Sequence, residues 1–327
     1  MTLKPHLGSL LLLALSPLWF ADAHSALRIL GSPFPGGRES CRWSLPAQQF
    51  LMLSDSGKIE LLNGCDVKLF IVGMITADDG TDFVKLASWS DGYYKRSGTI
   101  GYLSQLRLNS AGGSVVASIM IAKAIRASAL MHDRGMAWIP PASKCYSACV
   151  IVLAGSYRRI VAGSVGIHRP YFVGDEYTQM GYKDLKQAYD GLYETLSALF
   201  KQWNLSRPLI DDMFAVPSTG VRILTDEELS AYGLDKDDWV LTEEYNANVR
   251  DACGDEAAAK ASVEDGLAAM AWWASPKGQE CQHKVGALLT ARLWAKIKRL
   301  CGETAANTVE HGQPPSRECI AKYKAAE

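Results

Sequence analysis

The stretch LNSAGGSVVASIMIAKAIRAS, residues 108–128, decides the fold class that this sequence predicts. The residues from Leu103 to Asn109 are typical of a buried strand, and the run after the glycines is apolar on nearly all sides, as in a buried helix. Gly112 and Gly113 stand between the two, where glycine lets the backbone approach a ligand closely. A strand that passes through a glycine turn into a buried helix indicates an α/β unit.

Neighbouring segments extend this pattern on both sides. VKLFIVGMI, residues 67–75, is an apolar β-rich run that ends at the turn signal ADDG, and GMAWI, residues 135–139, precedes a proline turn. ACVIVLAGS, residues 148–156, fits a short buried helix or strand, and SVGIH, residues 164–168, fits a further strand. The order strand, helix, strand, helix, strand predicts an α/β fold with a parallel sheet.

An amphipathic helix is predicted over residues 182–203, and Asn204 and Pro208 end it. Such a stripe is more typical of core or subunit packing than of a cofactor site. Its members are Leu185, Tyr189, Leu192, Leu196, Leu199 and Trp203.

The first residues are typical of a secretory signal peptide. An apolar run, Leu7–Phe20, precedes the A-x-A pattern of residues 21–23, after which we expect cleavage. The run is shorter than the about 20 residues of a membrane span, and Pro17 interrupts it. We therefore expect a periplasmic or secreted protein with no integral membrane segment after cleavage.

Eight cysteines follow the predicted signal peptide. An even number in an exported chain favours disulfides, whereas metal binding is disfavoured because no CxxC occurs and no histidine lies at zinc-finger spacing. No metal and no cofactor are therefore expected. The cysteines are Cys41, Cys65, Cys145, Cys149, Cys253, Cys281, Cys301 and Cys319.

Composition divides the chain into four parts. After the signal peptide, 1–23, a Gly-, Pro- and Ser-rich segment, 24–64, is expected to be a loosely structured lead-in tied down through Cys41. The α/β domain is expected over 65–245. The Ala- and Lys-rich segment 250–327 holds four of the cysteines and predicts a small helical, disulfide-stapled appendage.

The charge balance argues against polyanionic partners. The chain has 34 basic and 35 acidic side chains, a net charge of -1, so no overall field attracts nucleic acid or anionic lipid. We expect no nucleic-acid partner.

Three segments together carry the parts of a hydrolytic site. A serine hydroxyl attacks a carbonyl only with a base beside it and N–H donors for the oxyanion. Ser147 lies at a predicted strand-to-helix junction, His168 ends the next strand, and the glycine turn at 112–113 can offer free N–H groups. Taken singly, each has an ordinary explanation: a turn, an N-cap serine and a core or surface histidine.

In this order, LNSAGGSV, CYSAC with VIVLAGSYRRIVAGSVGIHRP, and LTDEELSAYGL resemble the ClpP/crotonase superfamily, in particular a secreted branch of ClpP-like serine peptidases. The resemblance covers residues 67–234, about half the chain. It implies a spiral of β-β-α units, with Ser147 as nucleophile, His168 as base, and Gly113 and Ala148 as oxyanion donors. Family members usually form rings, and residues 182–203 occupy the place of their oligomerisation handle, which suggests a homo-oligomer.

The sequence departs from the family where an aspartate would orient the histidine. Alignment on residues 232–234 places Val221 there. The acid fixes the tautomer and orientation of the base, so its loss leaves a Ser–His dyad of reduced activity as one outcome. The other candidates for the third member are Asp211, Asp212, Asp226, Ser218 and Thr219.

A lysine base is the alternative to His168. AGSVG also resembles the GSIGV of the signal peptide peptidase A branch, and Lys183 and Lys186 lie at suitable distances downstream. A lysine base needs a pKa lowered by burial. Both lysines flank an amphipathic stripe and are expected to face water, so we favour His168.

Cys145 and Cys149 bracket the serine in CYSAC. On a helix, four residues of separation give a Cα distance within disulfide range but a demanding Cβ direction. We hypothesise a disulfide that fixes Ser147 and its donor. The alternatives are two buried free thiols, pairing with other cysteines, or a thiol protease built on Cys149 and His168.

The predicted function is an exported, ATP-independent ClpP-like serine peptidase that acts on short peptides or unfolded proteins. ATP is scarce outside the cytoplasm, so the family's usual ATPase partner is not expected. A non-catalytic ClpP-like scaffold that binds a peptide or protein partner is the alternative. An acyl-CoA-handling crotonase is disfavoured because coenzyme A is cytosolic.

Overall fold

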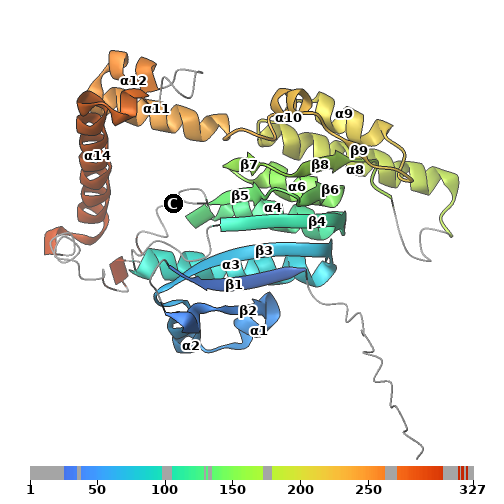
Figure 1. Ribbon diagram of the computed structural model, residues 1–327, viewed down its shortest axis with the longest axis horizontal. Coiled ribbons are helices and arrows are strands. Elements are labelled where there is room, and N and C mark those ends of the chain that lie inside the picture. The colour runs from blue at the N-terminus through green and yellow to red at the C-terminus, as the bar shows by residue number, and fades with distance from the viewer. Residues whose placement is uncertain are drawn as a thin grey trace, which may run out of the picture.

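The structure is a computed structural model, and it describes residues 26–34, 38–97, 105–128, 130–131, 135–171, 179–261 and 271–304, with 316, 318, 319 and 322 (Figure 1). The predicted signal peptide, 1–23, lies outside the described residues. So does most of the chain beyond residue 304.

One mixed sheet forms the centre of the protein, and the predicted α/β class with a parallel sheet is confirmed. Strand order is β2-β1-β3-β4-β6-β8-β9, with β5 pairing β4 and β7. The pairs β3–β4, β4–β5, β4–β6, β5–β7 and β6–β8 are parallel. The strands are β1 Leu27–Pro33, β2 Trp43–Pro46, β3 Cys65–Ile75, β4 Gln105–Gly113, β5 Met136–Ile139, β6 Lys144–Tyr146, β7 Arg159–Val161, β8 Ser164–Ile167 and β9 Arg222–Ile223.

Helices follow the strands in the β-β-α order, as in β5-β6-α6 and β7-β8-α8. Figure 1 shows α3 behind the sheet, and α8, α9 and α10 beyond its β8–β9 end. The helices are η1 Glu39–Cys41, α1 Ala47–Met52, α2 Asp55–Leu62, α3 Ala77–Ser97, α4 Val115–Ala127, α6 Ala148–Gly155, α8 Tyr182–Gln202, α9 Pro208–Ala215, α10 Asp226–Tyr232, α11 Trp239–Cys253, α12 Asp255–Ala261 and α14 Pro276–Cys301.

The core lies between the sheet and the helices α3, α4 and α6. Leu69 and Ile71 of β3 and Leu106 and Leu108 of β4 are buried at alternate positions, the period of a strand with one face in a core. The segment 148–156, which fitted a helix or a strand, forms helix α6, and all eight of its helical residues are buried. A helix apolar on every side is stable only inside a protein.

The parallel register brings three chain segments to one edge of the sheet. Ile75 of β3 pairs with Gly113 of β4, while Cys145 of β6 pairs with both Ser110 of β4 and Val165 of β8. Because parallel strands share their direction, their carboxyl ends meet at the same edge. Residues 110–113, 147 and 168 therefore lie together at this edge.

Residues 24–64 differ from the expected loose lead-in, because from residue 26 the described part contains β1, η1, β2, α1 and α2. Strand β1 pairs antiparallel with β3 and β2, and the Cys41–Cys65 disulfide joins the segment to β3. Only tertiary pairing makes this stretch regular, since its Gly, Pro and Ser content weakens local preference for a strand. The sheet thus begins well before Cys65.

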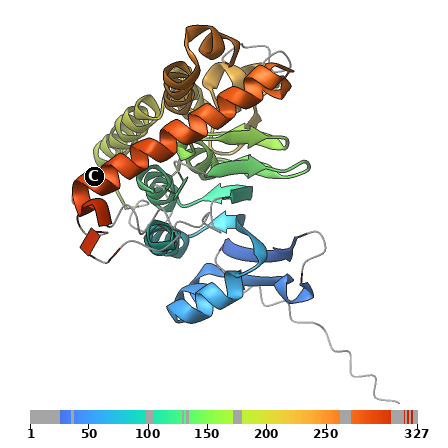
Figure 2. The same ribbon diagram turned by 90° about the vertical axis from the view of Figure 1, so that its left-hand side faces the viewer.

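The C-terminal helices α11, α12 and α14 form a small cluster of their own around Val249, Ala258, Cys281 and Val285. Disulfides Cys253–Cys281 and Cys301–Cys319 close two loops there, and the four disulfides use all eight cysteines. In Figure 2 the long helix α14 runs across the front of the view. Of the described helices, none combines the length and the apolar character needed to cross a membrane.

A buried ion pair fixes the start of α11 to the core. Asp238, the N-cap of α11, accepts hydrogen bonds from Arg126 Nη1 at 2.6 Å, Asn204 Nδ2 at 2.8 Å and Val240 N at 3.1 Å. Arg126 also donates from Nε to the carbonyl of Gly155. The Asp238 side chain is fully buried, so its charge depends on these partners.

We expect Asp238→Asn to be strongly destabilising, because it leaves the Arg126 charge buried without its counter-ion. Breaking a buried pair in this way costs about 3–5 kcal/mol. Urea denaturation followed by circular dichroism measures the loss. Asp251→Asn is the matched control, since the Arg292–Asp251 pair is about half exposed and such pairs contribute about 0–1 kcal/mol. Equal losses in both variants would contradict the assignment.

Candidate functional site

Ser147 occupies a sharp turn between β6 and α6. Its φ of 55° and ψ of -125° are unusual for a non-glycine residue, and such conformations cost about 1–3 kcal/mol and concentrate at functional sites. The ordinary alternative, an N-cap serine, does not hold, since its side chain makes no capping hydrogen bond. Its N–H donates to the carbonyl of Gly166 at 2.9 Å, which ties the turn to β8.

The glycine turn of β4 lies directly against Ser147. A Cβ on Gly112 would stand 2.7 Å from Ser147 Cβ and 3.1 Å from the backbone nitrogen of Ala148. Gly112 and Gly113 have φ of 104° and 136°, which L side chains rarely adopt. Gly113, the donor that the sequence suggested, lies one residue further on, and its own Cβ position meets the backbone of Ile75.

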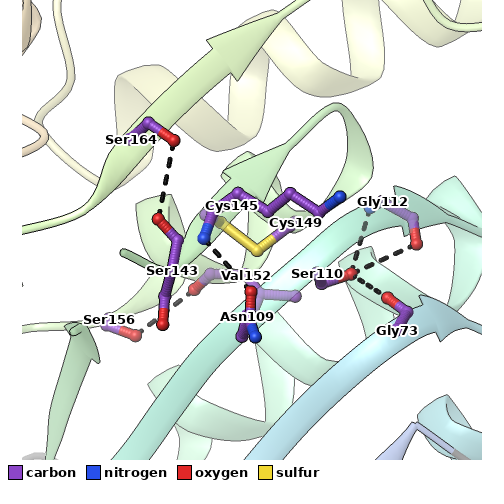
Figure 3. The surroundings of a disulfide bond; sticks show 11 residues. Gly73, Asn109, Ser110, Gly112, Ser143, Cys145, Cys149, Val152, Ser156 and Ser164 are labelled. Atoms are coloured by element: carbon purple, nitrogen blue, oxygen red, sulfur yellow. Dashed lines mark hydrogen bonds between the residues drawn. A yellow bond between two sulfur atoms is a disulfide. The ribbon is translucent and has the colours of Figure 1, made fainter. Parts of the chain in front are cut away.

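Ser110 organises this turn, and sequence reasoning did not single it out. Its hydroxyl donates to the carbonyl of Gly73 at 2.6 Å and accepts the N–H of Gly112 at 3.0 Å (Figure 3). Asn109 Oδ1 accepts the N–H of Lys144 at 3.2 Å and so joins the turn to β6. The sequence feature that could have identified Ser110 is its position inside LNSAGG, close to the glycine pair.

His168 follows β8 at the same edge and is 7% exposed. Its Nδ1 lies 2.9 Å from the carbonyl oxygen of Arg169. Because a carbonyl can only accept, Nδ1 is the donor in this contact, and in the neutral ring Nε2 then carries the lone pair. The ring stacks on Tyr171 with centroids 6.0 Å apart.

The structure brings Ser147 and His168 to one edge without a hydrogen bond between them. Tyr146 pairs with Gly166, so the next residues along the two strands, Ser147 and Ile167, are neighbours, and His168 is one residue further. Catalytic hydrogen bonds are often long before substrate binds. The arrangement places a serine hydroxyl, an imidazole and the N-terminal end of helix α6 at one edge of the sheet.

Val221, where the sequence resemblance would place an aspartate, lies over Gly166 of β8, with its Cγ1 2.5 Å from the Cβ position of that glycine. The nearby carboxylates are engaged elsewhere. Asp211 accepts from Tyr193 Oη at 2.5 Å, and Asp212 pairs with Arg222 at 3.1 Å.

The remaining candidates for the third member lie after α9. Asp226 begins helix α10, and Ser218 and Thr219 lie in the turn before β9. Among the described residues, no side chain of the five candidates hydrogen-bonds to His168, whose Nδ1 meets a main-chain carbonyl instead.

The lysine alternative has no support in the geometry. Lys183 and Lys186 are both exposed on α8. Lys186 donates to Asp190 at 2.6 Å, and this hydrogen bond raises the pKa of Lys186. A lysine base needs the opposite shift.

Cys145 and Cys149 form a disulfide across the serine turn, with their Cα atoms 5.2 Å apart (Figure 3). Both side chains are fully buried. This pairing differs from each alternative that the sequence left open: free thiols, other partners, and a Cys149 nucleophile, since a disulfide sulfur cannot form the thiolate.

Comparison with solved structures finds proteins of low sequence identity. A mutant of the membrane-bound stomatin-specific protease 1510-N matches with 18% identity and a TM-score of 0.37, covering 54% of this chain and 82% of its own. ClpP1 from Listeria monocytogenes matches with 16% identity and a TM-score of 0.37, covering 51% and 88%. No family model and no curated protein matches the sequence.

We expect Gly112→Ala to disrupt the serine turn, because the new methyl group meets Ser147 and the φ of 104° is unfavourable for alanine. The loss should be about 1–3 kcal/mol, measured by urea denaturation. Gly191→Ala is the matched control, since nothing lies within 4 Å of its Cβ position in α8, and it should stabilise by up to about 1 kcal/mol. A neutral Gly112→Ala would show that the turn is not tightly packed.

Removing the Cys145–Cys149 disulfide should affect the turn more than global stability. In the chain-entropy description this short loop contributes about 2 kcal/mol, against about 3.5 kcal/mol for the longer Cys41–Cys65 loop. Paired Cys→Ser variants at each disulfide test this by denaturation. Hydrogen-exchange mass spectrometry should show faster exchange at 144–150 in the first variant alone. The same exchange increase in both variants would contradict a local role.

Proposed function

We propose that this chain is an exported, ATP-independent ClpP-like serine peptidase in which Ser147 is the nucleophile and His168 the base. The observation that carries the proposal is the Ser147 turn: a serine held at positive φ, packed against a glycine turn, at the edge that also holds His168. Neither the fold likeness nor the motifs alone would carry it.

The proposed mechanism is acyl transfer to serine. His168 Nε2 takes the Ser147 proton as the hydroxyl attacks a peptide carbonyl, and the protonated imidazole then gives that proton to the leaving amine. The N–H groups of Gly113 and Ala148 hold the oxyanion, and water hydrolyses the acyl-enzyme. Ala148 N–H begins helix α6, where N–H groups lack intrahelical partners.

The choice of Gly113 as donor is supported by the hydrogen bonds that the N–H groups of the residues on either side of it already make. Gly112 N–H donates to Ser110 Oγ, and Ser114 N–H donates to the carbonyl of Ile75 at 2.8 Å. The N–H of Gly113 stands between these two bonds. We assign this N–H to the oxyanion.

A neutral carbonyl in place of a carboxylate has a consequence for the rate. The Arg169 carbonyl can hold the tautomer and ring orientation of His168. It gives the imidazolium of the transition state less stabilisation than a full negative charge. We therefore infer a dyad with lower activity than a Ser-His-Asp triad.

Export and assembly complete the proposal. Four disulfides suit an oxidising compartment, which supports a periplasmic or secreted location. The N-terminal half of α8 presents half-buried Leu185, Tyr189 and Leu192, and we propose this stripe as a contact between copies in a homo-oligomer. Short or unfolded peptides are the proposed substrates.

A non-catalytic scaffold is the second candidate. The absence of a direct Ser147–His168 bond and the valine at 221 favour it. In that case the edge beside the glycine turn would bind an extended peptide by strand addition, and Ser147→Ala would leave binding intact.

A fluorophosphonate probe on the oxidised protein tests the proposal. We expect covalent labelling of wild type within the range of about pH 5 to 9. Ser147→Ala and His168→Ala should abolish it. Ser118→Ala, at a buried serine of α4, and His283→Ala, on the exposed face of α14, are the matched controls and should label normally. A folded wild type that never labels would favour the scaffold.

A further inference from the structure

The Ser110 hydroxyl links two irregular segments of neighbouring strands. It is fully buried, donates to the carbonyl of Gly73 at 2.6 Å and accepts the N–H of Gly112 at 3.0 Å. One hydroxyl thus acts as donor toward β3 and as acceptor toward the turn of β4 (Figure 3). Without the Ser110 hydroxyl, the Gly73 carbonyl and the Gly112 N–H would each lose this hydrogen bond, at a point where the β3–β4 pairing is irregular.

The ladder is broken at Gly73. The β3–β4 register shifts between Gly73 and Met74, so Ser110 pairs with Gly73 while Gly112 pairs with Met74. Gly73 has a φ of 91°, and the open space around its Cβ position shows that packing does not hold it there. A bulge redirects a strand and often lies beside a functional site.

The bulge and the glycine turn lead directly to the nucleophile. The N–H of Gly112 donates to the Ser110 hydroxyl, and Gly112 itself packs against Ser147 and the backbone nitrogen of Ala148. Movement of Gly112 would therefore shift the serine turn and the donor groups together. Misplacement of reacting groups by about 1 Å can lower rates by about 100-fold.

We propose that Ser110 is a positioning residue of this site: its hydroxyl couples the β3 bulge to the glycine turn and so sets the oxyanion donors against Ser147. Its catalytic consequence rests on the proposed peptidase function. The coupling itself concerns the backbone and does not need that function. Ser110 touches neither substrate nor reacting atoms in this role.

Ser118 provides an unusually close control. It is also a fully buried serine, on α4, but its hydroxyl has no hydrogen-bond partner among the described residues. Ser118→Ala therefore removes the same oxygen without breaking a bond. The Ser110 hydroxyl also lies 3.3 Å from the carbonyl oxygen of Gly112. The difference between Ser110→Ala and Ser118→Ala isolates the hydrogen bonds of the Ser110 hydroxyl.

Fluorophosphonate inactivation kinetics test the catalytic consequence. We expect Ser110→Ala to slow the second-order rate by about 10- to 100-fold relative to Ser118→Ala. For peptide hydrolysis, kcat should fall more than KM rises. Ser110→Cys, which keeps the volume and a weak donor, should lie between. Wild-type rates in Ser110→Ala would overturn the proposal.

Hydrogen exchange at residues 108–115 tests the coupling without using activity. The Gly112 amide should exchange slowly in wild type and in Ser118→Ala, and faster in Ser110→Ala. Unchanged exchange in Ser110→Ala would overturn the coupling even if wild type labels. If the Gly112 amide exchanges faster in Ser110→Ala but the wild type never reacts with the fluorophosphonate, the coupling is supported and the proposed peptidase function is contradicted. If Ser110→Ala does not fold, the same two outcomes are measured on Ser110→Cys.

Discussion

The parallel pairing of β3, β4, β6 and β8 is the constraint on which the rest of the structure depends. It places the ends of chain segments that are far apart in sequence at one edge of the sheet, through the pairs Ile75–Gly113, Ser110–Cys145 and Tyr146–Gly166. The buried faces of the strands and the fully apolar helix α6 hold that register, because a slip by one residue would turn each core side chain toward the other face. The site exists only as long as this register does.

The serine turn is held from several sides, in keeping with its unfavourable backbone. Ser147 at φ 55° is bonded through its N–H to Gly166, bridged by the Cys145–Cys149 disulfide, and packed against Gly112. Each restraint acts over a few residues. A short disulfide loop adds little to global stability compared with a long one, so the value of this one lies in the local shape. Strain at one residue persists only where its surroundings determine it in this way.

The contact of His168 Nδ1 is with a main-chain carbonyl instead of a carboxylate. A carboxylate would both orient the imidazole and stabilise its charge. Here the Arg169 carbonyl takes over the first task, while Asp211 and Asp212 are occupied by Tyr193 and by Arg222. In the proposed peptidase, orientation without charge would give a reduced driving force. It also explains why peptidase and scaffold are the two functions to separate.

The sequence by itself determined the α/β class, the strands around the glycine turn and the amphipathic helix, because these follow from apolar periodicity and turn residues that are local to each segment. The ordered Gly, Ser and His motifs likewise gave the candidate residues. Tertiary structure decided what periodicity cannot encode. Within 24–64, β1 forms by pairing with β3 and β2 forms by pairing with β1, and ACVIVLAGS becomes a helix because it is enclosed on all sides. The contacts of the Ser110 hydroxyl and of the Arg169 carbonyl depend on backbone geometry, so the residue types alone do not predict these contacts.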